Sequence, residues 1–292
     1  MAIVQALAEK SIERVGTYQN IPDIVLVSAQ HDRGMYLFHD GVIDRVSRGS
    51  ITGLWVDNGK LHFAYVSHDH ARIGQLNGDG ETSFRVNTEV GDIHDIRYFE
   101  GKFYAVSTVT NEICIIAEDG TLTERLQFPG AGDAWHLNCL DNWNGRLVVS
   151  AFGEFDWHRQ WKGNYKEQGI VADVKTREVL WKGLSQPHSP KLLPDGTKCI
   201  CDSYAQKLLV DRDGEVKAVE FKGKYPRGLS FGEQNLYVGL SQSRRVDMLK
   251  AEEAKAGMAV VDRQSLEVKQ FVPLPVVEIY DVLVLPASEK SA

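Results

Sequence analysis

Three histidines at a repeated spacing are the side chains of this chain best suited to chemistry. When six segments of the sequence are overlaid, His94, His136 and His188 fall at the second position of three consecutive segments. The full column at that position is Thr52, His94, His136, His188, Arg227 and Tyr280. Imidazole binds transition metals and exchanges protons near neutral pH. The column therefore predicts a metal site or an acid–base site.

The overlay also predicts the fold. Successive column positions are 42, 42, 52, 39 and 53 residues apart. Five of the segments are followed by a turn and a second β-rich run, with hairpin turns such as Asn58-Gly59 and Asp195-Gly196. A period of this length with several short strands per unit is typical of propeller blades. We predict an all-β, six-bladed β-propeller, rather than a stack of unrelated hairpins such as a sandwich.

The two ends of the chain supply the means of closing the ring. The last segment, from Ile279, lacks a second run, and the strands expected over 23–48 lack an inner strand before them. Pairing these two ends would complete the sixth blade and remove open sheet edges. We predict a single domain over 1–292, with a short helix over 5–15 inside an N-terminal helical extension, 1–20.

Composition excludes several classes of protein. The net charge of −7 argues against nucleic acid and anionic membranes as partners. No apolar run is long enough to span a membrane, and no signal peptide is expected. Cys199 and Cys201 lie two apart in an expected strand and have no metal-binding or redox spacing, so we expect reduced cysteines in the core of a cytoplasmic protein.

Loops that enter inner strands and loops that leave second strands share one face of a propeller. Seven of the nine histidines fall in these loops: His31, His68, His70, His94, His136, His158 and His188. Two insertions, 153–168 and 242–256, reach the same face, and the middle of the second reads as a short helix. Long loops in compact domains are usually functional. We expect the first, with Trp157, Trp161 and Tyr165, to act as a lid over a central pocket.

Strand alternation leaves two possibilities for the side chains that face the channel. The second column position is polar throughout, whereas the third reads Gly53, Asp95, Leu137, Ser189, Gly228 and Asp281. We expect the second to face the channel. Asp95, Asn138, Glu278 and Asp281 are further candidates, because the entry to a strand is often irregular.

Two interpretations of the histidines stay open. His94, His136 and His188 suit a divalent transition metal such as zinc, iron, copper, nickel or manganese, with an open position for water or substrate. They suit equally a metal-free polar pocket of hydrogen-bonded side chains, or a purely structural role. In the metal interpretation, Asp281, Glu278 or Asp95 would complete the shell or act as general base.

The remaining candidates concern the substrate. Arg227 could bind a carboxylate or phosphate in a bidentate manner, or pair with Glu278 or Asp281. Tyr280 could donate a proton or stack. We expect Thr52, Asn138, Trp157, Trp161 and Arg227 to contact the ligand.

Several stretches resemble a family of uncharacterised bacterial proteins with six-bladed propellers. They are Trp135–Asn138, Gly183–Pro190, Arg227–Leu229, Val238–Ser241 and Glu278–Val282. The similarity runs from about Asp133 onward and implies the fold rather than an activity.

The architecture is more distantly similar to gluconolactonase, regucalcin and strictosidine synthase. That resemblance implies a divalent ion held by oxygen ligands at the channel mouth. Asn138 and Asp281 match in role, but His94 and His188 would stand where oxygen ligands are expected, which argues against calcium and against direct transfer of lactonase activity.

The sequence therefore favours a metal-dependent hydrolase or lactonase, lyase or isomerase that acts on a small polar, anionic molecule. The alternatives are a non-catalytic propeller that binds a ligand or a protein, and a metal-free acid–base enzyme.

Overall fold

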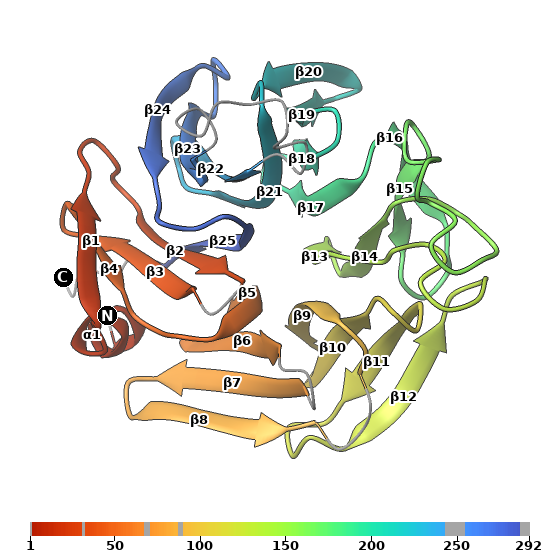
Figure 1. Cartoon of the computed structure of the whole chain (residues 1–292), viewed down its shortest axis with the longest axis horizontal. Helices are drawn as coiled ribbons and strands as arrows, with labels where there is room; N and C mark the ends of the chain where they lie inside the picture. The colour runs from red at the N-terminus through yellow and green to blue at the C-terminus, as the bar shows by residue number, and fades with distance from the viewer. Residues whose placement is uncertain (1, 31–32, 67–70, 87–89, 243–254, 287–292) are drawn as a thin grey trace.

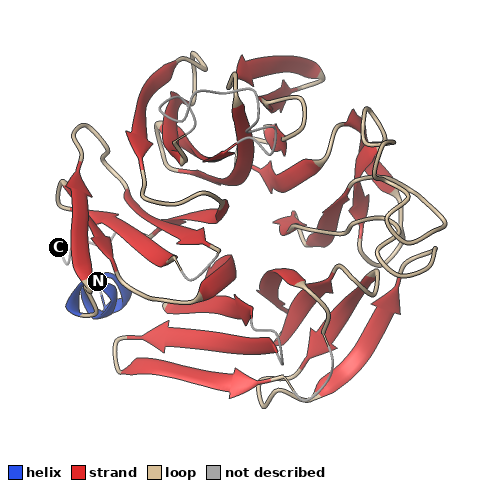
Figure 2. Cartoon of the chain, in the orientation of Figure 1, coloured by secondary structure: helices blue, strands red, loops and turns tan. Residues whose placement is uncertain are grey.

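The chain forms a ring of six β-sheets around a central axis, as Figures 1 and 2 show. This computed structural model describes residues 2–30, 33–66, 71–86, 90–242 and 255–286, and the side chains of Phe84 and Arg85 are not described. The prediction of an all-β, six-bladed propeller is confirmed. The described helix is too short to cross a membrane.

Five blades are consecutive four-stranded antiparallel sheets, and the strands of each are numbered outward from the axis. The first comprises β5 (Ser50–Asp57), β6 (Lys60–Val66), β7 (Ala71–Asn77) and β8 (Gly80–Arg85). The second comprises β9 (Ile93–Phe99), β10 (Lys102–Ser107), β11 (Glu112–Ile116) and β12 (Leu122–Gln127). The third comprises β13 (Leu140–Trp143), β14 (Arg146–Ala151), β15 (Gly169–Asp173) and β16 (Val179–Leu184). The fourth comprises β17 (Pro187–Leu192), β18 (Lys198–Asp202), β19 (Lys207–Arg212) and β20 (Glu215–Glu220). The fifth comprises β21 (Lys224–Phe231), β22 (Asn235–Gln242), β23 (Gly257–Asp262) and β24 (Val268–Pro273).

The sixth blade joins the two ends of the chain, as the sequence predicts. From the rim to the axis it comprises β1 (Glu13–Thr17), β4 (Val42–Arg45), β3 (Gly34–His39), β2 (Ile24–Ala29) and β25 (Ile279–Leu285). The innermost strand β25 pairs with β2 over six residue pairs, from Ile24 with Leu285 to Ala29 with Ile279. The ring is therefore closed by strands from opposite ends of the sequence.

The N-terminal segment differs in part from its predicted form. The helix α1 spans Ala2–Glu9 rather than 5–15, and Glu13–Thr17 forms the strand β1. The open edge of β4 offers backbone hydrogen bonds to this segment, with Glu13 opposite Arg45 and Thr17 opposite Val42. That pairing outweighs the helical periodicity of the sequence. The helix buries Ile3 and Leu7 against the blade that begins with β5.

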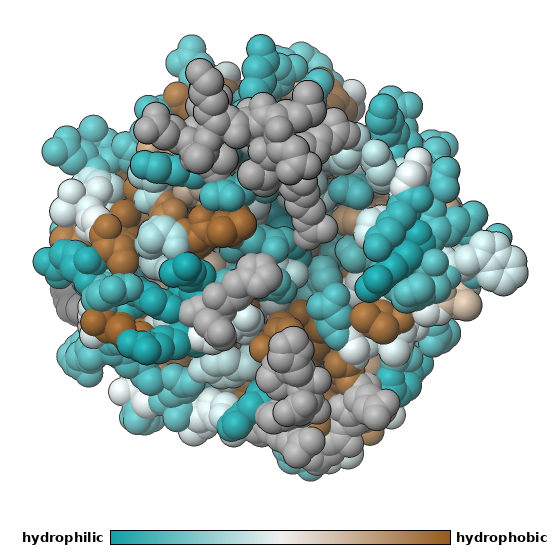
Figure 3. Space-filling model, in the orientation of Figure 1, coloured by the Kyte–Doolittle hydropathy of each residue, from teal (hydrophilic) through white to brown (hydrophobic). Residues whose placement is uncertain are grey.

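Apolar cores lie between neighbouring blades. One cluster joins Val27 and Tyr36 of the closing blade to Met258 and Val260 of β23. All four cysteines are buried and none forms a disulfide, which agrees with the interior position expected for Cys199 and Cys201. In Figure 3 the visible face is largely hydrophilic, and its apolar side chains lie in small separate patches.

Polar side chains of the third column position fasten one blade to the next. Asp281 of β25 accepts the Leu54 amide at 2.9 Å, and Asp95 of β9 accepts the Leu140 amide at 2.8 Å. Ser189 of β17 accepts the Gly228 amide at 3.0 Å. Gly228 has a φ of +83°, and a Cβ there would lie 2.9 Å from the backbone of the neighbouring blade, so this close approach requires glycine. Buried hydrogen bonds thus join three pairs of neighbouring inner strands and hold them as a frame around the axis.

Candidate functional site

The second column position gathers five side chains at the axis, which we call the axial cluster: His94, His136, His188, Arg227 and Tyr280. The guanidinium carbon of Arg227 lies 3.4 Å from the centre of the Tyr280 ring, and that ring lies 5.8 Å from His94. The His94 and His136 rings lie 5.2 Å apart, nearly perpendicular to each other. Five blades therefore bring together side chains that are 39 to 186 residues apart in the sequence.

His136 is the best supported base of the cluster. Its Nδ1 lies 2.9 Å from Oδ1 of Asp133, a carboxylate that is 2% exposed. An ionised carboxylate only accepts hydrogen bonds, so the neutral imidazole carries its proton on Nδ1 and keeps a lone pair on Nε2. Burial lowers the pKa of His136 below its usual 6.5, while the bond to Asp133 opposes this change. At neutral pH His136 is thus an oriented, unprotonated base.

The backbone at His136 is unusual, and it explains why β13 begins only at Leu140. His136 has a φ of +52°, in the left-handed region that is costly for most residues. This turn interrupts the extended chain four residues before β13 begins to pair with β14. His136 therefore does not open a strand, contrary to expectation. The turn also allows His136 to reach Asp133, three residues earlier. Strain of this kind often marks functional positions.

The insertion 153–168 packs on this pair of residues. Trp161 lies 4.5 Å from the His136 ring, between ring centres. The Nδ1 of His158 accepts the Asp133 amide at 3.1 Å, and Arg159 donates to Oδ2 of Asp133 at 3.4 Å. Trp157, by contrast, is 67% exposed. The insertion therefore supports His136 and Asp133 directly, with Trp161 at the site and Trp157 pointing to solvent.

The other two histidines are held in the same way through Nδ1. His94 Nδ1 lies 3.3 Å from the Asp92 carbonyl oxygen. His188 Nδ1 lies 3.1 Å from the Gln186 carbonyl and 2.9 Å from the Ser203 hydroxyl, which itself donates to the Pro226 carbonyl. Carbonyl acceptors place the proton on Nδ1 in both rings. All three imidazoles thus have the same tautomer.

The arrangement does not fit a single three-histidine metal centre. Metal-binding histidines do have this kind of Nδ1 support. However, Phe152 lies between His136 and His188, with its ring 4.1 Å from the first and 5.4 Å from the second. Within the described ranges, no group of three His, Cys, Asp or Glu side chains is placed to hold a metal ion.

Arg227 lies over the Tyr280 ring and is almost fully buried. Its Nη1 donates to Oε1 of Glu278 at 2.8 Å. Burial lowers the pKa of Arg227, but Tyr280 and Glu278 outweigh that effect and the pKa is raised. Burial likewise raises the pKa of Tyr280 to about 12, against the opposing effect of Arg227. Arg227 is therefore charged and Tyr280 protonated at neutral pH.

Other candidate residues make contacts that favour structural roles. Thr52 donates to the Ile93 carbonyl at 2.9 Å, and Asn138 donates to the His136 carbonyl at 3.1 Å. Asp281 and Asp95 accept backbone amides, and Nη1 of Arg97 lies 2.6 Å from Oδ1 of Asp95. These carboxylates are buried between blades.

Sequence reasoning missed Asp133, Phe152 and Ser203. The Asp-x-x-His spacing of Asp133 and His136 is the one local signal that was available. Phe152 and Ser203 follow the second strands of their blades, and only the closed ring brings them beside the histidines. His31, His68, His70 and the helix expected within 242–256 lie outside the described residues, save for the ends of that insertion.

Comparison with known proteins gives the family. The chain matches the family described as a domain of unknown function (DUF4915) over residues 83–292 and belongs to it. A search of curated proteins found no match. The expected membership of an uncharacterised propeller family is therefore confirmed.

Solved structures share the fold at low sequence identity. A nidogen/laminin complex gives a TM-score of 0.64 at 14% identity, over 89% of this chain and 97% of the other. A luciferin-regenerating enzyme gives 0.60 at 14% identity, over 88% and 83%. Virginiamycin B lyase from Staphylococcus aureus gives 0.54 at 10% identity, over 90% and 88%. These similarities concern the fold, and two of the three proteins are enzymes.

Proposed function

We propose that the axial cluster is an acid–base site that acts on a small polar molecule, with His136 as the general base. The observation that carries this proposal is the 2.9 Å contact between Asp133 and Nδ1 of His136. A buried carboxylate that fixes the tautomer of an imidazole is a recurrent arrangement for proton transfer. The position of Trp161 over the ring adds a wall that excludes water.

The chemistry that best suits this set is proton abstraction beside a carbonyl group. Nε2 of His136 takes the proton from carbon, the electron pair of that C–H bond forms a carbon–carbon double bond, and the π electrons of the carbonyl group move to its oxygen. The protonated Tyr280 supplies a hydrogen-bond donor to the oxygen. Return of the proton at another atom gives isomerisation, and departure of a group from the neighbouring carbon gives elimination. A positioned base contributes roughly 10²- to 10⁴-fold to such rates.

The distant similarity to a lyase and to a luciferin-regenerating enzyme supports an enzyme on this fold, without defining the reaction. The charge of Arg227 and the compact cluster support a small molecule as the ligand. We expect the protein to be cytoplasmic, in keeping with its four unpaired buried cysteines.

Hydrogen exchange tests the proposal without knowledge of the final product. Wild-type protein is incubated in D₂O with keto acids, hydroxy acids, aldonic acids and their lactones, and NMR measures loss of C–H signals. We expect exchange with at least one class, reduced about 100-fold or more in His136→Gln. If a compound binds but the rate of exchange is the same in wild type and His136→Gln, the protein is instead a non-catalytic propeller.

A metal at His94, His136 and His188 stays a prediction that needs its own test. Elemental mass spectrometry on untagged protein, wild type beside His136→Ala, measures zinc, iron, copper, nickel and manganese. The acid–base proposal expects exchange to survive chelation. Stoichiometric metal that disappears in the variant, together with activity lost on chelation, would replace it by the metal-dependent alternative.

A further inference from the structure

Arg227 has one edge of its guanidinium without a hydrogen-bond partner. The side chain is 2% exposed, and Nη1 is bonded to Glu278. Nε and Nη2 are both buried, and neither has a partner in the described structure. Burial of charged donors without acceptors costs free energy. An anion bound at this edge would accept hydrogen bonds from both nitrogens.

The two unpartnered nitrogens form the bidentate edge of the guanidinium. The N–H bonds of Nε and Nη2 point in parallel, and their spacing matches two oxygens of a carboxylate or a phosphate. The Tyr280 ring lies against the plane of the group and keeps this edge in position. Glu278 takes the other side, so the bound orientation of Arg227 exists before the ligand arrives.

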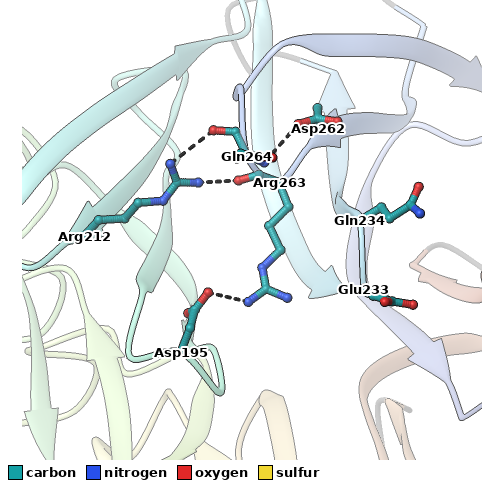
Figure 4. Close-up of a pocket in the computed structure, with 7 residues that line it drawn as sticks. All are labelled: Asp195, Arg212, Glu233, Gln234, Asp262, Arg263 and Gln264. Atoms are coloured by element: carbon teal, nitrogen blue, oxygen red, sulfur yellow. Dashed lines mark hydrogen bonds and ion pairs between the residues drawn. The ribbon is translucent and has the colours of Figure 1, made fainter.

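The other buried arginine side chains within the described ranges do not offer such an edge. In the cavity of about 510 Å³ between β19 and β23, Arg212 donates to the carbonyls of Arg263 and Gln264, and Arg263 pairs with Asp195 (Figure 4). Near the axis, Nη1 of Arg97 donates to Asp95, and its Nε is buried without a partner while its Nη2 is not among the buried, unpartnered atoms. Among the buried arginine atoms of the described chain, both nitrogens of one edge are unpartnered at Arg227 alone.

We propose that the Nε–Nη2 edge of Arg227 binds the two oxygens of a carboxylate or phosphate group of the substrate. This inference rests on the proposed function, because the molecule that it binds is the substrate of the axial cluster. Ring contacts connect Arg227 to Tyr280, Tyr280 to His94, and His94 to His136. The carboxylate or phosphate group anchors one end of the substrate, and the reacting carbon at the other end faces His136. Since neither nitrogen touches solvent, the anion must displace side chains that now cover this edge.

NMR of the Arg227 Nε–H group tests the inference directly. The resonance is assigned by its loss in Arg227→Lys, and wild type is titrated with inorganic phosphate and, separately, with malonate, at constant ionic strength set with chloride. We expect a saturable shift with at least one anion. Arg227→Lys keeps the charge but loses the edge, and should weaken affinity about tenfold or more, measured by calorimetry. Phosphate alone would indicate a phosphate ester, and malonate alone a carboxylate.

Control variants separate this inference from the acid–base proposal. Arg212→Lys should bind the anion as wild type does, because that arginine is occupied by backbone carbonyls. His136→Gln should also keep anion binding while losing exchange, so the two proposals fail independently. If Arg227→Lys does not fold, Glu278→Gln serves instead, because loss of the competing carboxylate should tighten binding. No saturable shift with either anion, or equal affinity in Arg227→Lys, would overturn the inference.

Discussion

The indole of Trp161 and the imidazole of His136 lie 4.5 Å apart between ring centres, at an interplanar angle of 50°. The same indole lies 5.2 Å from Phe152. One aromatic side chain of the insertion thus covers the proposed base and contacts the ring that separates it from His188. The insertion is part of the site rather than a loop above it.

The two tryptophans of the insertion provide a matched pair of variants. Trp161→Ala removes a buried ring beside His136 and should cost about 3–5 kcal/mol of unfolding free energy. It should also raise the pKa of His136 toward 6.5, because water reaches the imidazole. Trp157→Ala, at an exposed site, should change stability by about 0.5 kcal/mol or less. Urea unfolding measures the stability of both variants, and equal losses of unfolding free energy would contradict the assigned packing.

Much of the fold could be predicted from the sequence, because each blade must repeat the same strand and turn pattern to close the ring. The exception at the N-terminus is physical: the segment at Glu13–Thr17 gains hydrogen bonds from the edge of β4 that no local pattern reveals. The column of histidines was predicted for the same reason as the blades.

The details of the site were less predictable. His136 leaves the strand pattern through a left-handed φ, and this brings Asp133 to its Nδ1. Phe152 separates His136 from His188 by side-chain packing alone. The role of Asp281 depends on backbone amides, and amides are the same in every residue, so no sequence signal distinguishes a carboxylate that holds a frame from one that does chemistry.

Asp281 should matter to stability more than to proton transfer. Its Oδ2 accepts the Leu54 amide of the next blade and its Oδ1 accepts the Val282 amide. In Asp281→Asn one amide N–H meets the side-chain NH₂, so we expect a loss of about 1–3 kcal/mol in unfolding free energy. Asp40→Asn, at an exposed carboxylate, is the control. Loss of deuterium exchange in folded Asp281→Asn, at unchanged stability, would assign Asp281 to the chemistry instead.

His62 should make stability fall in mild acid. It packs against Tyr98 and Phe103, and burial, then Lys60, lowers its pKa to about 4 from 6.5. Between these values the unfolded chain binds the proton and the folded chain does not, so stability decreases as pH falls from 6.5 toward 4. At about pH 4.5 the loss is about 2–3 kcal/mol relative to about pH 7.

The substitution His62→Phe keeps an aromatic ring in place and removes the titration. Urea unfolding at both pH values should show a smaller acid-induced loss in this variant than in wild type, by about 2–3 kcal/mol. The same pH dependence in both proteins would show that His62 does not contribute in this way.

The role of Asp133 in orienting His136 is tested most directly by ¹⁵N NMR of the His136 ring in wild type and Asp133→Asn. We expect neutral His136 to carry its proton on Nδ1, with a pKa below 6.5 in wild type. In Asp133→Asn the pKa should fall further, because the hydrogen bond and the negative charge that favour the imidazolium are lost. A neutral ring protonated on Nε2, or a pKa unchanged by Asp133→Asn, would contradict the assignment of His136 as a base oriented by Asp133.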